Sequence, residues 1–333
     1  MLGKPDQALS SFDMAIRFDP KMTQFWLNKG LVFRQLGRYR EALTAFEQAL
    51  ALDRTNATSW SGKASVLHEL GRLEEALDAY GQAYTYNPAL VSAWSGKGSV
   101  LYDMGRSRLK DAQQAYQEAL RLDKNYAPAL YGLGNVLYAQ QKLKRALEMF
   151  EQATKSDPKF ARAWHRRGNV LSELGDRMRA LDCYDQALRL DPRYASAWSS
   201  KASILTQLQR YPEALNAYNY ALSANPNFAQ AWNGNGNVFY YLGDYPKALD
   251  AYERAVRINP RMASAWHNKS LVLKQLRRNQ EALASAEEAI RLAPQDPDNW
   301  QRKAEALRQL RRRGEARKAE EQVTLLRSRM LMR

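Results

Sequence analysis

Tyrosine, asparagine, histidine, serine and arginine side chains recur along this 333-residue chain at spacings that would place them on one face of successive helices. Such side chains donate and accept hydrogen bonds, and together they suit the polar backbone of an extended peptide. The candidate binding residues are Ser95, Ser99, Tyr102, Tyr131, Asn135, Tyr138, Arg162, His165, Arg166, Asn169, Asn233, Asn237, Tyr240, Tyr241, His267, Asn268 and Arg302. A merely solvated face is the alternative; tyrosine and asparagine favour binding, because inert helix surfaces carry more glutamate and lysine.

The elements that would hold these residues repeat with a fixed period. Trp26, Trp60 and Trp94 are 34 residues apart, and Leu130 fills the next tryptophan position after an insertion of two residues. The remaining tryptophans keep the same step, at Trp164, Trp198, Trp232, Trp266 and Trp300. A period of about 20–50 residues indicates one supersecondary unit stacked on copies of itself.

The copy that begins at residue 229 shows the pattern most fully. Its key residues are Trp232, Gly236, Gly243, Tyr245, Ala248, Tyr252, Ala255 and Pro260. This pattern resembles the tetratricopeptide repeat (TPR). The resemblance implies an all-α fold, a right-handed solenoid of helix–turn–helix repeats, and a concave groove lined by copy positions 2, 5, 6, 9, 12 and 13. A step of about 100° per residue independently points those positions away from the tryptophan side.

Copy boundaries follow from the same alignment. We expect a partial copy at 1–22 that contains only a second helix, and a degenerate, basic copy or cap at 297–333. Eight full copies lie between them, at 23–56, 57–90, 91–126, 127–160, 161–194, 195–228, 229–262 and 263–296. Because the first helix of the partial copy is missing, we expect the chain to be a fragment of a longer array or of a protein with an upstream domain.

Three copies depart from the pattern. The copy at 91–126 has two extra residues around Arg106–Lys110, which fit either a tolerated turn insertion or a contact loop. Ala286 and Glu320 stand where other copies carry phenylalanine or tyrosine. Thinner packing there predicts a softer C-terminal end.

Two binding modes known within the family fit poorly. Co-chaperone TPR proteins resemble this chain at Asn237, Asn268 and Arg302, but Asn233 and Asp298 stand where their carboxylate clamp needs lysines. Long arrays with an asparagine ladder carry asparagine at copy position 6. Here glycine holds that position four times, at Gly62, Gly96, Gly132 and Gly234.

The sequence predicts neither a metal site nor catalysis. His68, His165 and His267 lie alone in different copies, without the spacing of metal ligands. There is no glycine-rich phosphate loop, no GxSxG motif and no carboxylate pair in an apolar setting, so we expect a protein without cofactors that is not an enzyme. The strongest local anion site is the cluster of Arg162, Arg166 and Arg167 with His165, and helix-surface charge with no ligand is the equal alternative.

Composition indicates the charge of the partners and the compartment in which the protein works. The net charge is +15, and from residue 297 onward eleven basic side chains stand against five acidic ones, which favours acidic partners. Cys183 is the only cysteine, so no intrachain disulfide is possible and a cytoplasmic location is expected. No apolar run reaches the roughly 18 residues of a membrane helix. The Trp-x-x-Lys-Gly form of Trp26–Gly30 resembles prokaryotic arrays and implies a bacterial source.

Three functions remain open. The first is a scaffold that binds a partner peptide or helix in the groove. The second is nucleic-acid binding through the basic C-terminal copy, which predicts an affinity that falls steeply with salt. The third is self-assembly through incomplete ends, which predicts oligomers. Basic residues are mixed with acids and lack an accompanying aromatic stripe, which favours the first.

Overall fold

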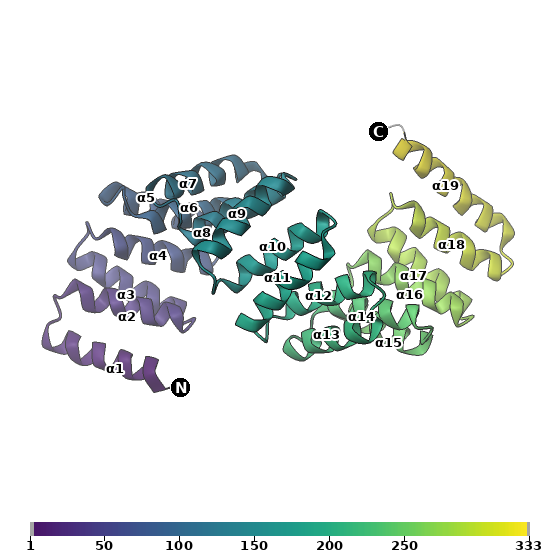
Figure 1. Cartoon of the computed structure of the whole chain (residues 1–333), viewed down its shortest axis with the longest axis horizontal. Helices are drawn as coiled ribbons and strands as arrows, with labels where there is room; N and C mark the ends of the chain where they lie inside the picture. Colours follow the sequence, from purple (N-terminus) through teal and green to yellow (C-terminus); the bar gives the residue numbers. More distant parts are fainter. Residues whose placement is uncertain (1–2, 332–333) are drawn as a thin grey trace. The chain divides into compact units, whose positions relative to one another are not determined.

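The computed structural model describes residues 3–331, and all regular structure in that range is helical (Figure 1). The first helices of the copies are α2 (Thr23–Gln35), α4 (Ala57–Glu69), α6 (Val91–Asp103), α8 (Ala127–Ala139), α10 (Ala161–Glu173), α12 (Ala195–Gln207), α14 (Ala229–Tyr241), α16 (Ala263–Gln275) and α18 (Pro297–Gln309). The second helices are α1 (Gly3–Phe18), α3 (Tyr39–Leu52), α5 (Leu73–Tyr86), α7 (Leu109–Leu122), α9 (Leu143–Ser156), α11 (Arg177–Leu190), α13 (Tyr211–Ala224), α15 (Tyr245–Ile258), α17 (Asn279–Leu292) and α19 (Arg313–Leu331). The predicted all-α solenoid of helix pairs is confirmed.

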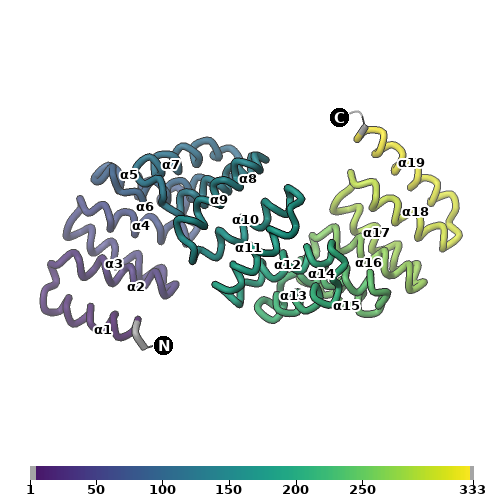
Figure 2. Tube along the Cα trace, viewed as in Figure 1, coloured from purple at the N-terminus to yellow at the C-terminus, as the bar shows by residue number. Residues whose placement is uncertain are grey.

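The helices group into two compact units, Met1–Val170 and Leu171–Arg333. Within each unit a helix packs against the next helix along the chain, and first helices of neighbouring copies also touch, as α4 and α6 do in one unit and α14 and α16 in the other. Figure 2 shows how short the connections between helices are. The proposed copy boundaries stay a prediction, and their outer ends, residues 1–2 and 332–333, lie outside the described residues.

The turn inside each helix pair passes through the left-handed backbone region. Glycine occupies this position in five copies, with φ between 72° at Gly37 and 102° at Gly105. In four other copies the residue is Gln141, Gln209, Arg277 or Arg311, with φ between 58° and 61°. Glycine is therefore absent from four of these turns, where a side chain at positive φ costs conformational free energy.

In the copy at 91–126, the two extra residues form a short 3₁₀ turn, η1 (Arg106–Arg108), before α7. Arg108 Nε donates to Asp111 Oδ2 at 2.8 Å, and this bond ties the inserted turn to the first turn of α7. The insertion is thus absorbed locally and leaves the pairing of α6 with α7 intact.

Each tryptophan closes the turn that precedes its own helix. In all eight cases the indole Nε1–H donates to the backbone carbonyl six residues earlier, over 2.8–3.2 Å. The acceptors are the carbonyls of Pro20, Arg54, Pro88, Pro158, Pro192, Pro226, Pro260 and Pro294. This bond satisfies a carbonyl in the turn and ties the first helix of a copy to the segment that precedes it.

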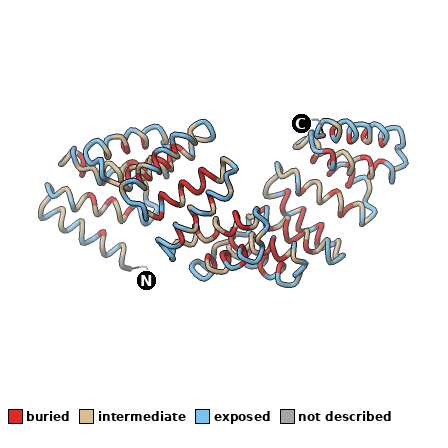
Figure 3. The backbone as a smooth tube through the Cα atoms, turned by 45° about the horizontal axis from the view of Figure 1, so that its top comes forward, coloured by how far each residue is buried: buried red, intermediate tan, exposed pale blue. Residues whose placement is uncertain are grey.

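In the copies from 23–56 to 229–262, the core is an aromatic ring on the second helix, and Gly98 and Gly132 show that the Tyr116 ring is held between two first helices. A Cβ added to Gly98 would lie 2.8 Å from the Tyr116 ring, and one added to Gly132 would lie 2.2 Å from the same ring. Tyr116 is 3% exposed and Phe150, at the same position of the next copy, is fully buried. Figure 3 shows that the buried residues follow the helix faces that meet a neighbour.

Candidate binding face

We call the side of the first helices formed by copy positions 2, 5, 6, 9, 12 and 13 the polar face. Its side chains reach from one first helix to the next. Asn268 Nδ2, on α16, donates to Asn233 Oδ1 and to Asn237 Oδ1 on α14, both at 3.0 Å. Tyr252, on the second helix α15, donates to Asn237 Oδ1 at 2.8 Å. Three predicted binding residues are thus brought into one network.

The network continues toward α18. His267 Nδ1 lies 2.9 Å from Oδ1 of Asn299, a fully buried residue that the sequence analysis did not single out. Gln275 donates to the hydroxyl of Tyr240 at 3.2 Å. Both links join neighbouring first helices, as the amide network does. A signal for Asn299 existed, because it holds copy position 3, beside the predicted position 2.

Arg302 lies on the polar face but its charge is already matched. Its Nη1 is 2.9 Å from Glu305 Oε2, and Lys274 is 2.8 Å from the same oxygen. Burial acts to raise the pKa of Glu305, but the hydrogen bond from Lys274 and the charge of Arg302 lower it below its usual value overall. Glu305 therefore stays ionised, and Arg302 binds it before any external anion.

The other unit shows the same linkage between first helices. Arg34 donates to the Ser65 hydroxyl at 3.0 Å, and His68 Nε2 lies 2.7 Å from Asp103 Oδ2. Ser99 lies 3.0 Å from the Tyr116 hydroxyl, which joins the polar face to the core. Tyr102 is half-buried and packs against the core of this region.

Three predicted residues are buried instead of lining an open surface: Ser95 is 5% exposed, Asn135 is 8% exposed and His165 is 7% exposed. Burial lowers the pKa of His165 to about 4, and the neighbouring charge of Arg166 adds to the effect. His165 is therefore neutral at pH 7 and adds no charge to an anion site.

The expected cluster of three arginines is divided. Arg167 stacks over the Trp164 ring at 5.3 Å and pairs with Glu151 at 3.2 Å, which places it on the tryptophan side. Arg162 is exposed and Arg166 is half-buried, so these two remain on the polar face with Asn169. The prediction that Arg167 belongs to this cluster is wrong, because copy position 7 points toward the preceding copy.

Aromatic side chains complete the polar face in both units. Tyr131 contacts the Phe150 and Phe160 rings, with centroid distances of 5.9 Å and 5.0 Å, and Tyr138 packs half-buried nearby. In the other unit Tyr241 is 60% exposed and stacks on Tyr211 at 5.9 Å. Tyr241 is the most open of the predicted aromatic residues.

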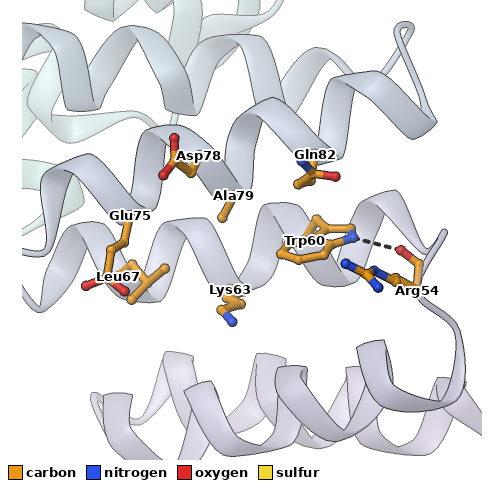
Figure 4. A pocket seen from close by; sticks show the side chains of 8 residues that line it. All are labelled: Arg54, Trp60, Lys63, Leu67, Glu75, Asp78, Ala79 and Gln82. Atoms are coloured by element: carbon orange, nitrogen blue, oxygen red, sulfur yellow. Dashed lines mark hydrogen bonds between the residues drawn. The ribbon is translucent and has the colours of Figure 1, made fainter.

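The opposite side of the helices carries pockets built around the tryptophans. Figure 4 shows one of about 290 Å³, with Trp60, Lys63 and Leu67 of α4 facing Glu75 and other residues of α5. None of its lining residues is a predicted binding residue. Within residues 3–331 there is no group of three or more histidine, cysteine, aspartate or glutamate side chains that could hold a metal ion. None of the described helices has the length and apolarity needed to cross a membrane.

Paired helices, a ring held between small residues and a tryptophan that recurs in eight copies define the class of an α-solenoid built from helix-pair repeats. One family model described as tetratricopeptide repeat matches residues 2–39, 27–90, 165–230, 207–263 and 233–297. A second model with the same description matches residues 103–169. The chain therefore belongs to the tetratricopeptide repeat family. Proteins of this family generally mediate protein–protein interactions.

Solved structures share the fold. A chain of the APC/C hetero-tetramer Cut9-Hcn1 has a TM-score of 0.70 at 16% identity, and the alignment covers 86% of this chain and 56% of that one. For pilF of Pseudomonas aeruginosa the TM-score is 0.58 at 20% identity, and the alignment covers 66% of this chain and 98% of that one. For a tetratricopeptide repeat protein from Parabacteroides merdae the TM-score is 0.57 at 16% identity, and the alignment covers 76% of this chain and 99% of that one. At these identities the likeness shows the fold alone. Among curated proteins none matches this sequence.

Proposed function

We propose that this chain is a non-catalytic interaction scaffold that binds an extended segment of a partner protein along the polar face. The observation that carries the proposal is the amide network of Asn233, Asn237 and Asn268. Asn268 uses its Nδ2 in this network and Asn233 uses its Oδ1. The Asn268 oxygen and the Asn233 Nδ2 group make no hydrogen bond to the described residues, and one acceptor beside one donor matches a peptide group.

Further features support a peptide ligand. Tyr241 offers an exposed ring next to this network, and aromatic residues contribute strongly to protein interfaces. Because neighbouring first helices hold the asparagines in place, little side-chain entropy is lost on binding. The sole cysteine, Cys183, is buried and forms no disulfide, which supports our proposal of a cytoplasmic location.

A displayed library of random peptides, selected on the intact chain, tests the proposal. Selected peptides should lose about fivefold to tenfold in affinity for each hydrogen bond removed, measured by calorimetry on Asn268→Ala and Asn233→Ala. Tyr241→Ala should also weaken binding. Asn227→Ala is the matched control, because Asn227 is exposed in a turn outside the polar face. Selected peptides that bind these three variants as tightly as the control would place the binding surface elsewhere.

The alternative functions have their own readouts. Nucleic-acid binding requires an affinity that falls steeply as salt rises, measured by gel shift. Several C-terminal arginines are already paired with acids, as Arg312 is with Glu315 and Arg308 is with Glu320. Self-association requires a mass by light scattering that grows with concentration.

A further inference from the structure

The tryptophan side contains a repeated set of three groups: an indole, a cation three residues later, and a carboxylate on the second helix of the preceding copy. Lys63 Nζ, for example, lies 5.7 Å from the centre of the Trp60 ring and 3.0 Å from Glu47 Oε1. Six cations at copy position 7 have such a carboxylate, at 2.5–3.2 Å: Lys29 with Asp13, Lys63 with Glu47, Arg167 with Glu151, Lys201 with Asp185, Lys269 with Glu253 and Lys303 with Glu287.

Lys97 is the exception. The acid that should face it is replaced by Gly81, sixteen residues earlier, and no carboxylate of residues 3–331 lies within 4.0 Å of its ammonium group. Around the point where a Cβ of residue 81 would lie, the Tyr84 hydroxyl at 3.7 Å is the nearest atom, so the place of the missing side chain is open. The structure thus has the cation and the space, and it lacks the carboxylate.

Aromatic rings hold Lys97 in position. Tyr84 and Trp94 stack with centroids 4.6 Å apart and planes 12° apart, and Nζ lies 4.9 Å and 5.3 Å from the two centroids. Since the lysine is half-buried on these rings, its ammonium group is already partly desolvated and oriented. Such a group gains more from an arriving carboxylate than a freely moving surface lysine does.

A cavity of about 530 Å³ borders the same lysine on the side of α7, and the corresponding pocket around Trp60 has about 290 Å³. Two acids line the larger cavity, but each has its own arginine: Asp111 pairs with Arg108 at 2.8 Å and Glu118 with Arg121 at 2.9 Å. Neither acid supplies the missing partner. The apolar wall formed by Leu101 and the polar rim give room for more of a ligand than its carboxylate.

We propose that Lys97, Tyr84 and Trp94 form a binding site for an aspartate or glutamate side chain of a partner protein, which takes the place that Glu47 takes beside Lys63. The six internal pairs identify the ligand chemistry as a carboxylate. This site is separate from the polar face and does not depend on peptide binding there. One such pair is weak alone, so it acts as one contact of a larger interface.

The test follows the indole N–H signals of the intact, ¹⁵N-tryptophan-labelled chain by NMR. The probe is an acetylated, amidated peptide with one glutamate between glycines, titrated to about 100 mM at constant ionic strength, because a single pair of this kind binds weakly. The Trp94 signal, assigned with Trp94→Phe, should shift toward saturation, and the Trp60 signal should not. The same peptide with glutamine should leave both unchanged.

Three variants complete the test, and the two at Gly81 have opposite expectations. Gly81→Glu places a carboxylate on the chain itself and should abolish the Trp94 response, and Gly81→Ala should retain it. Lys97→Met should abolish it without moving the Trp60 signal. An absent Trp94 response in the wild type, an equal response to the glutamine peptide, or an undiminished response in Gly81→Glu would overturn the proposal. Tighter saturation by free glutarate would overturn the assignment to a protein partner.

Discussion

Asn135 lacks the hydrogen bond that the residue at the same copy position makes in other copies with a tyrosine hydroxyl of the second helix. At the same copy position Ser99 lies 3.0 Å from the hydroxyl of Tyr116, and Asn237 accepts a hydrogen bond from Tyr252. Asn135 faces Phe150 instead, and its buried Oδ1 has no hydrogen-bond partner. A buried acceptor without a partner costs about 1–3 kcal/mol, so this copy tolerates a local loss of stability.

Phe150→Tyr should repair the defect. The added hydroxyl would donate to Asn135 Oδ1, as Tyr252 does to Asn237, and should raise the free energy of unfolding by about 1 kcal/mol. Denaturant unfolding of wild type and variant measures the change. Phe150→Tyr in an Asn135→Leu background is the control, because there the hydroxyl has no acceptor and should destabilise. A less stable single variant would show that the ring has no room for the oxygen.

His165 should make stability depend on pH. Its folded-state pKa of about 4 lies below the unfolded value of about 6.5, so the unfolded chain takes up the proton first. The contribution is complete above about pH 6.5 and is lost as the pH falls toward 4. Between about pH 7.5 and 5 the wild type should lose about 2 kcal/mol more unfolding free energy than His165→Gln. Parallel losses in both proteins would refute a buried neutral imidazole.

At the scale of the helices, the distance between neighbours is set by glycine and an aromatic ring together. A Cβ on Gly132 would lie 2.2 Å from Cε1 and Cζ of Tyr116, far inside any real contact. Gly96 and Gly234 meet the rings of Tyr80 and Tyr218 in the same way. Because these rings reach through to the next first helix, glycine at copy position 6 is a packing requirement after Tyr80, Tyr116 and Tyr218, and an asparagine has no room there. Asn268 holds the same copy position after Tyr252, so the requirement does not extend to every copy.

Gly132→Ala should therefore destabilise the fold by about 1–3 kcal/mol, because α7 and α8 must separate or the ring must leave its rotamer. The control is Gly81→Ala, where space is open and alanine should be neutral or stabilise the helix by up to about 1 kcal/mol. The denaturation midpoints of the two variants measure this difference. Equal midpoints would mean that the Tyr116 ring moves aside without a loss of stability.

The 34-residue period predicted the helix pairs, their family and the side of each helix that carries polar residues. It could not predict how deep each polar side chain lies, because depth depends on the ring that the neighbouring second helix inserts. Ser95 and Asn135 are buried for that reason. Nor could it show that Glu305 binds both Arg302 and Lys274. Lys274 lies in the preceding copy, and the repeat pattern does not indicate which side chains of two copies make contact.

At the scale of the molecule, the quality of packing differs along the chain. Ala286 on α17 stands where Tyr252 of α15 fills the core, and copy position 6 of the next helix holds Arg302. A buried ring is thus replaced by a methyl group and an ion pair. The sequence-based expectation of a softer C-terminal end has a structural basis in this exchange of apolar area for charge.

Amide hydrogen exchange should reveal this difference inside one unit. The core amides of α17 should exchange at least about tenfold faster than those of α15, equivalent to about 1.4 kcal/mol of local opening free energy. Both helices have neighbours on either side, so fraying at the chain end does not enter the comparison. Mass spectrometry on peptic fragments measures the ratio. Equal protection would show that Arg302 and Glu305 replace the ring fully.

Every indole N–H finds its acceptor six residues earlier, inside the same junction, and needs nothing from the rest of the chain. The eight junctions that contain a tryptophan are therefore chemically alike, and the junction before Leu130 is the exception. Recombination that deleted or duplicated a whole tryptophan-containing copy would leave each of these hydrogen bonds correctly made. The number of such copies is for this reason free to change in evolution.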